Sequence, residues 1–334
     1  MSGRPISGEW IGSAAALAAA IAAPFVLSSF ATFQLATTFS YAPAVLGLVI
    51  ITGLAGQVAL GNGAFFALGA YTTAVLVKTY GFPYWATFPI AAVLSLLTGL
   101  LIGIPSLRLR GHFLAALTLT IAVAAPQVIK HFAWLTNGVR GINVILPDPP
   151  EWLGIDATQR AYYVALFVTT VTFATTFALR NSRIGRALRA IQENELVATS
   201  LGINVARLKV AAFGYSTLLA GLGGSCFTVT VGYVAPENFT IGLAALLIIG
   251  LVIGGKTSEW GAVIGSLFIV VLPIYAGRID PALSGLCFAV AVVLTILLLP
   301  GGLVSLPGQL ARGVRWLPRS LSSLRSRRKL ENAS

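Results

Sequence analysis

The chain has 334 residues, of which 57% are apolar and only 10% are charged. An ordinary soluble domain is about 25% charged, so this composition leaves too little polar surface for a soluble fold. The apolar residues also form long runs, a pattern that is typical of membrane spans.

Ten of these runs are candidates for helices in a membrane. A span needs about 20 apolar residues to cross about 30 Å of hydrocarbon at about 1.5 Å per residue. The runs 64–79, 241–254 and 261–277 are short, and we expect them to be broken, re-entrant or buried within the bundle. A cleaved signal peptide is an alternative for the first run. The predicted fold class is therefore an all-α membrane protein, a polytopic bundle of about ten transmembrane helices at 11–30, 33–54, 64–79, 84–106, 112–130, 160–179, 210–233, 241–254, 261–277 and 281–299.

The distribution of basic residues predicts the orientation of this bundle. With the N-terminus inside, only Lys78, Lys130, Arg140, Arg160 and Arg278 lie on the outer side, which leaves 17 of the 22 Lys and Arg residues inside. The positive-inside rule favours this arrangement, with both termini in the cytoplasm. The net charge of +12 then needs no nucleic acid as a partner, because basic residues near a membrane interact with anionic lipid.

The whole chain, 1–334, is predicted to be a single transmembrane domain. It has an external loop at 131–159 rich in Pro and Gly, a cytoplasmic loop at 180–209 and a basic cytoplasmic tail at 300–334. Two Gly-rich stretches, 53–64 and 254–265, precede short apolar segments in the two halves of the chain. This repetition of a Gly-rich stretch hints at an inverted repeat, with a solute pathway between the two halves of the fold.

Two chemical signals in the sequence are rejected as sites. Residues 250–257 match the phosphate-loop pattern G-x-x-x-x-G-K-[ST]. That motif needs a strand and a soluble helix around it, whereas here both flanks are apolar membrane segments. Cys226 and Cys287 lie inside apolar runs and are expected to be small buried hydrophobes, and His112 and His131 are too few for a metal site.

The cytoplasmic loop carries the strongest signal. Apolar residues recur with helical periodicity at Ile184, Leu188, Ile191, Ala198 and Leu201, and we expect one helix that ends near Gly202. Its other face is polar. The helix either lies on the membrane surface or docks into a partner protein, with Ile184, Leu188 and Ile191 facing the membrane domain.

Blocks along the chain resemble one transporter family. Residues 185–195, G-R-A-L-R-A-I-Q-E-N-E, are similar to the cytoplasmic loop of permease subunits from branched-chain amino-acid ABC importers of the LivM type. Residues 53–61, 107–111, 135–141 and 232–237 are similar to further blocks of that family, in the same order. Ala59, Asn62 and Asn137 depart from the family's usual Ser, His and Gly.

The resemblance implies an ABC importer permease fold without catalytic chemistry of its own. It implies partners as well: two ATPase subunits, a second permease subunit and an extracytoplasmic solute-binding protein, in a bacterial inner membrane. This chain would bind no cofactor, since ATP and Mg would bind to the ATPases. The residues expected to form the ATPase-coupling helix are Arg186, Arg189, Glu193, Asn194, Glu195, Ala198 and Gly202.

The substrate pathway is predicted from polar residues inside the spans. Such residues are costly in lipid and face a pathway or bond to another helix. The candidates, with two glycines from the same Gly-rich break, are Gly56, Gln57, Gly61, Asn62, Thr118 and Thr120. The function expected is import of branched-chain or related amino acids by alternating access. The alternatives are a permease of the same superfamily for urea, a sugar or an aromatic acid, and a secondary carrier or channel.

Overall fold

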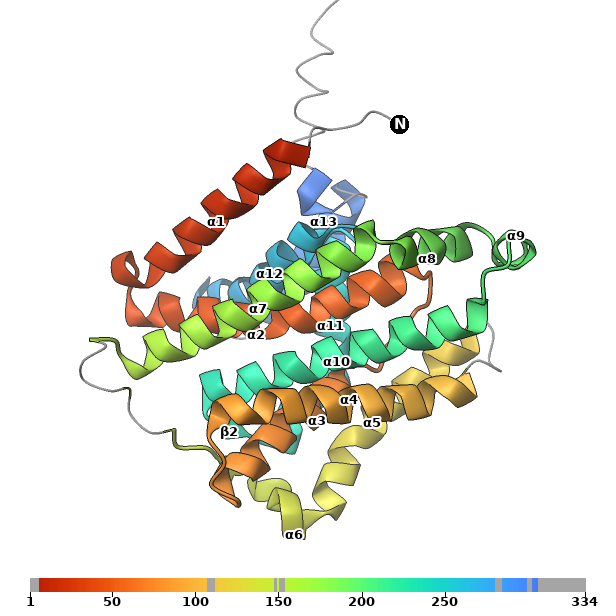
Figure 1. Ribbon diagram of the computed structural model, residues 1–334. Coiled ribbons are helices and arrows are strands. Elements are labelled where there is room, and N and C mark those ends of the chain that lie inside the picture. Colours follow the sequence, from red (N-terminus) through yellow and green to blue (C-terminus); the bar gives the residue numbers. More distant parts are fainter. Residues whose placement is uncertain are drawn as a thin grey trace, which may run out of the picture.

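The protein is seen here as a computed structural model that describes residues 6–106, 112–146, 149, 154–279, 284–298 and 302–305. The predicted turn at 107–111, most of the Pro-rich stretch 147–150 and the basic tail from 306 onward lie outside the described residues. The main helices are α1 (Ile6–Val26), α2 (Ser29–Leu48), α3 (Asn62–Lys78), α4 (Tyr84–Ser106), α5 (His112–His131), α7 (Ala157–Asn181), α10 (Val205–Val231), α11 (Ile241–Gly254), α12 (Glu259–Ile279) and α13 (Ser284–Leu298). The long helices α2, α4, α7 and α10 lie side by side with their axes close to one direction (Figure 1).

Short elements connect these helices. They are the π-helix η1 (Val49–Leu54), α6 (Ala133–Thr136), η2 (Gly138–Arg140), α8 (Arg183–Glu193), α9 (Glu195–Ser200), η4 (Pro236–Phe239) and η5 (Leu303–Ser305). Two strands, β1 (Ile142–Asn143) and β2 (Tyr233–Val234), also occur, although no strand was predicted.

The number of spans is smaller by strict criteria than the ten predicted. Within the described residues, five helices are long and apolar enough to cross a membrane: Ser29–Leu54, Tyr84–Pro105, Ala157–Asn181, Val205–Val231 and Glu259–Gly277. A sixth is added if Ala115–His131 and Ala133–Arg140, bent by 79°, count as one span. Ile241–Gly254 is too short, as the sequence suggested. The multi-pass helical architecture is confirmed, but the count of about ten is not.

Helix α10 forms the centre of the bundle, where it packs along α2, α3 and α4. Close approach depends on small residues, because a Cβ atom at Gly69 of α3 would lie 2.0 Å from the carbonyl oxygen of Gly221. Hydroxyl groups bond across the same interface: Ser225 donates to the Gly69 carbonyl at 3.3 Å, and Thr228 donates to the Ala70 carbonyl at 2.9 Å. Small residues and interhelical hydrogen bonds of this kind hold helices together where lipid gives no hydrophobic drive between them.

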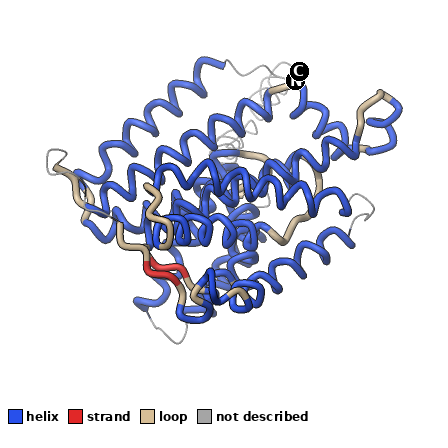
Figure 2. Tube along the Cα trace, turned by 60° about the horizontal axis from the view of Figure 1, so that its bottom comes forward, coloured by secondary structure: helices blue, strands red, loops and turns tan. Residues whose placement is uncertain are grey.

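The strands close the end of the bundle away from α8 and α9, which is the predicted external side. β1 pairs antiparallel with β2, with Ile142 opposite Val234, and Figure 2 shows this pair in red in an otherwise helical chain. On the same side, Lys130 at the end of α5 forms an ion pair of 3.3 Å with Glu237 in η4. The predicted loop 131–159 is thus partly ordered by pairing with the segment after α10.

At the α8–α9 end, the two Gly-rich stretches of the sequence contact each other. Gly53 in η1 lies so close to the turn after α11 that a Cβ atom would fall 1.8 Å from the carbonyl oxygen of Lys256. Lys256 itself follows the buried apolar end of α11, not a strand. The rejection of the phosphate-loop match therefore agrees with the local structure.

We predict that Gly69→Val will destabilise the protein by about 3 kcal/mol or more, because over-packing at a backbone contact forces α3 away from α10. The control is Gly285→Val, since no atom lies within 4 Å of a Cβ atom built at Gly285. Thermal unfolding of both variants in detergent measures the difference. Equal midpoints would show that α3 and α10 are not held by this contact.

Candidate functional site

The predicted docking segment folds as two helices, not one. Ser182 begins α8, and its hydroxyl accepts from the Gly185 amide at 3.3 Å. Asn194 breaks the segment, because its side-chain oxygen accepts from the amides of Leu196 and Val197 at 2.9 and 3.2 Å and so caps α9. Gly202 follows α9 with φ of +77°. An Asn at the start of a helix and a Gly past its end are the residues that these positions favour.

One side of α8 and α9 is packed on the bundle. Leu188, Ile191 and Ala198 are at most 2% exposed. They form an apolar cluster with Ile50, Leu54 and Ala55 at the end of α2 and η1, and with Ala212 of α10. The expected inward face is thus found for Leu188 and Ile191.

Ile184 does not belong to this face, which corrects the prediction. It is 48% exposed. In the first turn of α8 the inward position is taken by Gly185, where a Cβ atom would lie 2.3 Å from the Arg180 carbonyl oxygen. No larger side chain fits against the end of α7, so the helix turns Ile184 outward.

Two predicted coupling residues fold back onto their own chain. Arg189 donates to the carbonyl of Arg180 at 2.8 Å, and Arg186 donates to the carbonyl of Asn181 at 3.2 Å. Both acceptors are among the last carbonyls of α7, which have no partner inside the helix. These arginines therefore join α8 to α7, which differs from the expectation that Arg189 reaches out to a partner.

The outward side of the segment is a mixed apolar and polar surface, which we call the docking surface: Ile184, Glu193, Leu196, Val197 and Leu201. Leu196 is 80% exposed, Leu201 71% and Val197 55%. Glu193 is exposed as well. Glu195 is paired with Lys209, so its carboxylate is already engaged within the chain.

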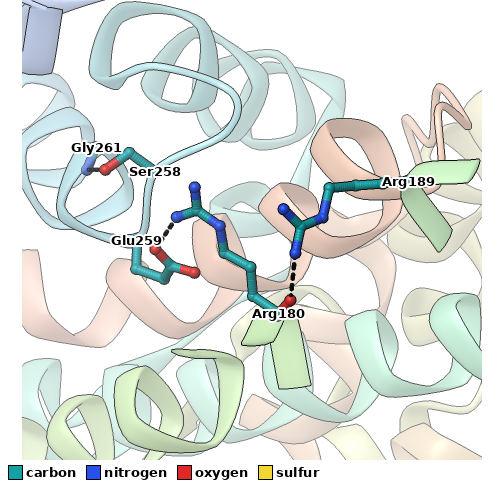
Figure 3. Close-up of polar contacts among 5 residues, drawn as sticks. All are labelled: Arg180, Arg189, Ser258, Glu259 and Gly261. Carbon is teal, nitrogen blue, oxygen red and sulfur yellow. Dashed lines mark hydrogen bonds and ion pairs between the residues drawn. The ribbon is translucent and has the colours of Figure 1, made fainter. Parts of the chain in front are cut away.

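A buried ion pair braces the base of this segment. Arg180 at the end of α7 points toward Glu259 at the start of α12, with 2.5 Å between Nη1 and Oε2, and Arg189 lies on the other side of Arg180 (Figure 3). The Glu259 side chain is only 3% exposed, and its Oε1 atom has no hydrogen-bond partner among the described residues. This pair was not predicted from the sequence, because 79 residues separate its members. The sequence does carry one signal for Glu259. It is an acidic residue at the start of an apolar helix, where the helix dipole favours a carboxylate.

The predicted pathway residues do not all lie in one place. Thr118 is buried and lies against Gly61, and its Oγ1 atom accepts from the Leu60 amide at 3.0 Å. Gly56 is exposed with φ of +67° and lies next to Gln192 of α8. Thr120 is exposed on another side of α5.

Asn62 and Gln57 have contrasting surroundings. Asn62 is 2% exposed, and its side chain donates to Ser216 Oγ at 3.0 Å and to the Ala44 carbonyl at 3.4 Å. These bonds fit the alternative of a hydrogen bond between helices. Gln57 is half-buried, and its Oε1 atom lacks a partner among the described residues.

An outward stripe on α5 is the second candidate surface. Ala116, Thr120, Val123 and Gln127 are exposed, and their spacings of 4, 3 and 4 place them on one helical face. Thr120 and Gln127 give this stripe its polar groups. Within the described part of the chain, no group of three or more His, Cys, Asp or Glu side chains could hold a metal ion.

The comparison with known families decides the assignment. Residues 30–299 match the family described as "Branched-chain amino acid transport system / permease component". The chain belongs to this family.

Individual relatives agree with this membership. The permease is 32% identical over 283 residues to the LivM protein of Escherichia coli K12, described as a high-affinity branched-chain amino acid transport system permease; the alignment covers 77% of this chain and 66% of the relative. It is 23% identical to the LivH permease protein of the same organism, over 80% of this chain and 92% of the relative. The ribose import permease RbsC of Haemophilus influenzae is 26% identical over 54% of this chain and 61% of its own. No solved structure matches the chain.

We predict that Glu259→Gln will destabilise the permease by about 1–3 kcal/mol, because it leaves Arg180 without its counter-ion in a largely buried place. Glu195→Gln is the matched control. The Glu195 side chain is 59% exposed, and an exposed pair is worth about 0–1 kcal/mol. Unfolding of both variants in the same detergent gives the comparison, and equal losses would contradict a structural role for the buried pair.

Proposed function

We propose that this permease is a membrane subunit of an ATP-driven importer for branched-chain or related amino acids. Family membership supports a transport role. The observation that carries the ATP-driven part is the docking surface, where exposed leucines and valine sit on a helix pair that is anchored from its other side. Exposed apolar groups rimmed by polar ones are typical of a protein interface.

The position of the docking surface argues for a protein partner over the membrane surface. α8 and α9 follow the end of α7, and α9, which carries Leu196 and Val197, lies at the far end of the molecule (Figure 1). A helix that lay on lipid would instead run across the ends of the spans. We propose that this end is cytoplasmic, in keeping with the basic residues predicted there, and that it contacts ATPase subunits, which bind ATP and Mg.

The full assembly that we propose contains two ATPases, a second permease and an external solute-binding protein. Similarity to both LivM and LivH, two permease proteins of one organism, supports a second permease subunit. The outward stripe on α5 is our candidate for the side of the pathway that this chain contributes. Alternating access then requires that ATP changes the contacts at the docking surface between two states of the bundle.

The function is tested with the complex purified through a tag on this chain and reconstituted in proteoliposomes with its binding protein. We expect ATP-dependent uptake of labelled leucine that exceeds uptake of ribose and urea. Ribose uptake would instead favour a sugar permease, an alternative that the similarity to the ribose permease RbsC supports. Leucine uptake that persists without ATP or ATPase subunits would mean a carrier or channel and would overturn the proposal.

The docking surface is tested by Glu193→Lys and Leu196→Ala. Both side chains are exposed, so the fold should tolerate the changes, but a buried contact in a complex should be lost. We expect each variant to insert normally and to weaken recovery of the ATPase with the permease by about tenfold, the effect of about 1.4 kcal/mol. Lys78→Glu, an exposed charge reversal near the other end of the bundle, is the control. Full ATPase recovery with both variants would remove the docking role.

A further inference from the structure

The π-helix η1 and the unwound segment after it connect two of the surfaces described above. α2 continues into η1, and residues 55–61 then run without helix to the start of α3. π-helical turns are rare and occur frequently at functional sites. The backbone bonds of this stretch are unusual too, since the Gln57 amide donates to the Ile51 carbonyl at 2.9 Å and the Thr52 hydroxyl donates to the Gln57 carbonyl at 3.0 Å. The segment 55–61, which we call the strut, is therefore ordered although it is not helical.

One end of the strut is packed against α8. Ala55 lies in the apolar cluster with Leu188 and Ile191. Next to it, a Cβ atom built at Gly56 would lie 3.1 Å from the Cγ atom of Gln192. The contact leaves little free space, so a shift of α8 toward the bundle moves the strut with it.

The other end of the strut is bonded to α5. The Leu60 amide donates to Thr118 Oγ1 at 3.0 Å. Beside this bond, a Cβ atom built at Gly61 would lie 3.0 Å from the Thr118 carbonyl oxygen and 3.1 Å from its Cβ atom. Thr118 is fully buried, and it is thus both the hydrogen-bond acceptor and the steric stop for the end of the strut.

Helix α5 is built to bend between its two attachments. Its far end is held by the ion pair between Lys130 and Glu237. Pro126 lies between this pair and Thr118, inside the helix, where it removes a backbone hydrogen bond and favours a kink. Three residues of the outward stripe lie on the part of α5 that this hinge would swing: Ala116, Thr120 and Val123. Gln127 lies just after the hinge.

We infer that the strut carries the movement of the docking helices to α5, with Thr118 as the positioning residue that receives it. The inference rests on the proposed function. α8 pushes on Ala55 and Gly56, and the ordered backbone transmits the displacement to Leu60 and Gly61. Thr118 then moves with them, so the half of α5 before Pro126 tilts and changes the pathway face. Thr118 acts without touching solute.

The test uses the complete reconstituted complex and compares Thr118→Val with Thr118→Ser. Valine keeps the shape but cannot accept the Leu60 amide, whereas serine can. We expect Thr118→Val to hydrolyse ATP at the wild-type rate while uptake falls, so that ATP consumed per solute rises by about tenfold, as the loss of one hydrogen bond allows. Thr118→Ser should restore the wild-type ratio. Thr170→Val is the control, because it makes the same change at a hydroxyl whose hydrogen bond among the described residues, 2.8 Å to the Leu166 carbonyl, lies within α7.

A second variant, at the other end of the strut, keeps the test decisive if Thr118→Val fails to fold. Gln192 is exposed, so Gln192→Ala should fold normally, and it should raise the ATP consumed per solute in the same direction. An unchanged ratio in both Thr118→Val and Gln192→Ala would overturn the inference, as would parallel loss of hydrolysis and uptake. The proposed function fails separately, if the wild-type complex shows no ATP-driven uptake.

Discussion

Close contact between α10 and its three neighbours is the constraint on which the rest of the molecule depends. Glycine and hydroxyl side chains let α2, α3 and α4 approach α10 until backbone meets backbone, as at Gly69 and Gly221. In lipid, dispersion contacts and interhelical hydrogen bonds must supply the attraction that water supplies elsewhere, and both require short distances. Such close packing resists separation of α10 from its neighbours, so we expect movement mainly in the elements attached to the outside of this group.

At the α8–α9 end, several different contacts hold α8 on the bundle. α8 is seated by apolar side chains, by two arginines that bond to the last carbonyls of α7, and by the Arg180–Glu259 pair at its base. α8 thus contacts η1, α10 and α7 directly, whereas the ion pair connects α7 in turn to α12, so a force applied to α8 reaches α12 only through α7. A buried ion pair is costly to form. The Arg180–Glu259 pair is therefore better explained as a contact that fixes the orientation of α7 against α12 than as one that adds stability.

Much of this arrangement could be read from the sequence, and the failures have local causes. Composition and apolar runs predicted a helical membrane bundle, because lipid allows few alternatives. Periodicity found Leu188 and Ile191, but it placed Ile184 on the same face since it could not detect that only Gly185 fits against α7. It also joined α8 to α9, although the capping side chain of Asn194 favours a break there. The partners of Glu259 and Thr118 depend on packing between distant helices, which no local pattern encodes.

The hydrogen bonds of Asn62 have a consequence for where a solute can pass. Asn62 bonds to Ser216 and to the Ala44 carbonyl, and these three residues are buried between α2, α3 and α10. A route for a zwitterionic solute through the middle of this one chain would need those bonds to be broken. In the importer that we propose, the solute would instead pass along an outer face of this chain, against a neighbouring subunit. Natural variants should accordingly fall into two classes. Changes at buried residues such as Asn62 and Ser216 should lower the amount of folded permease in the membrane. Changes on the outer face of α5 should instead alter which solute is preferred.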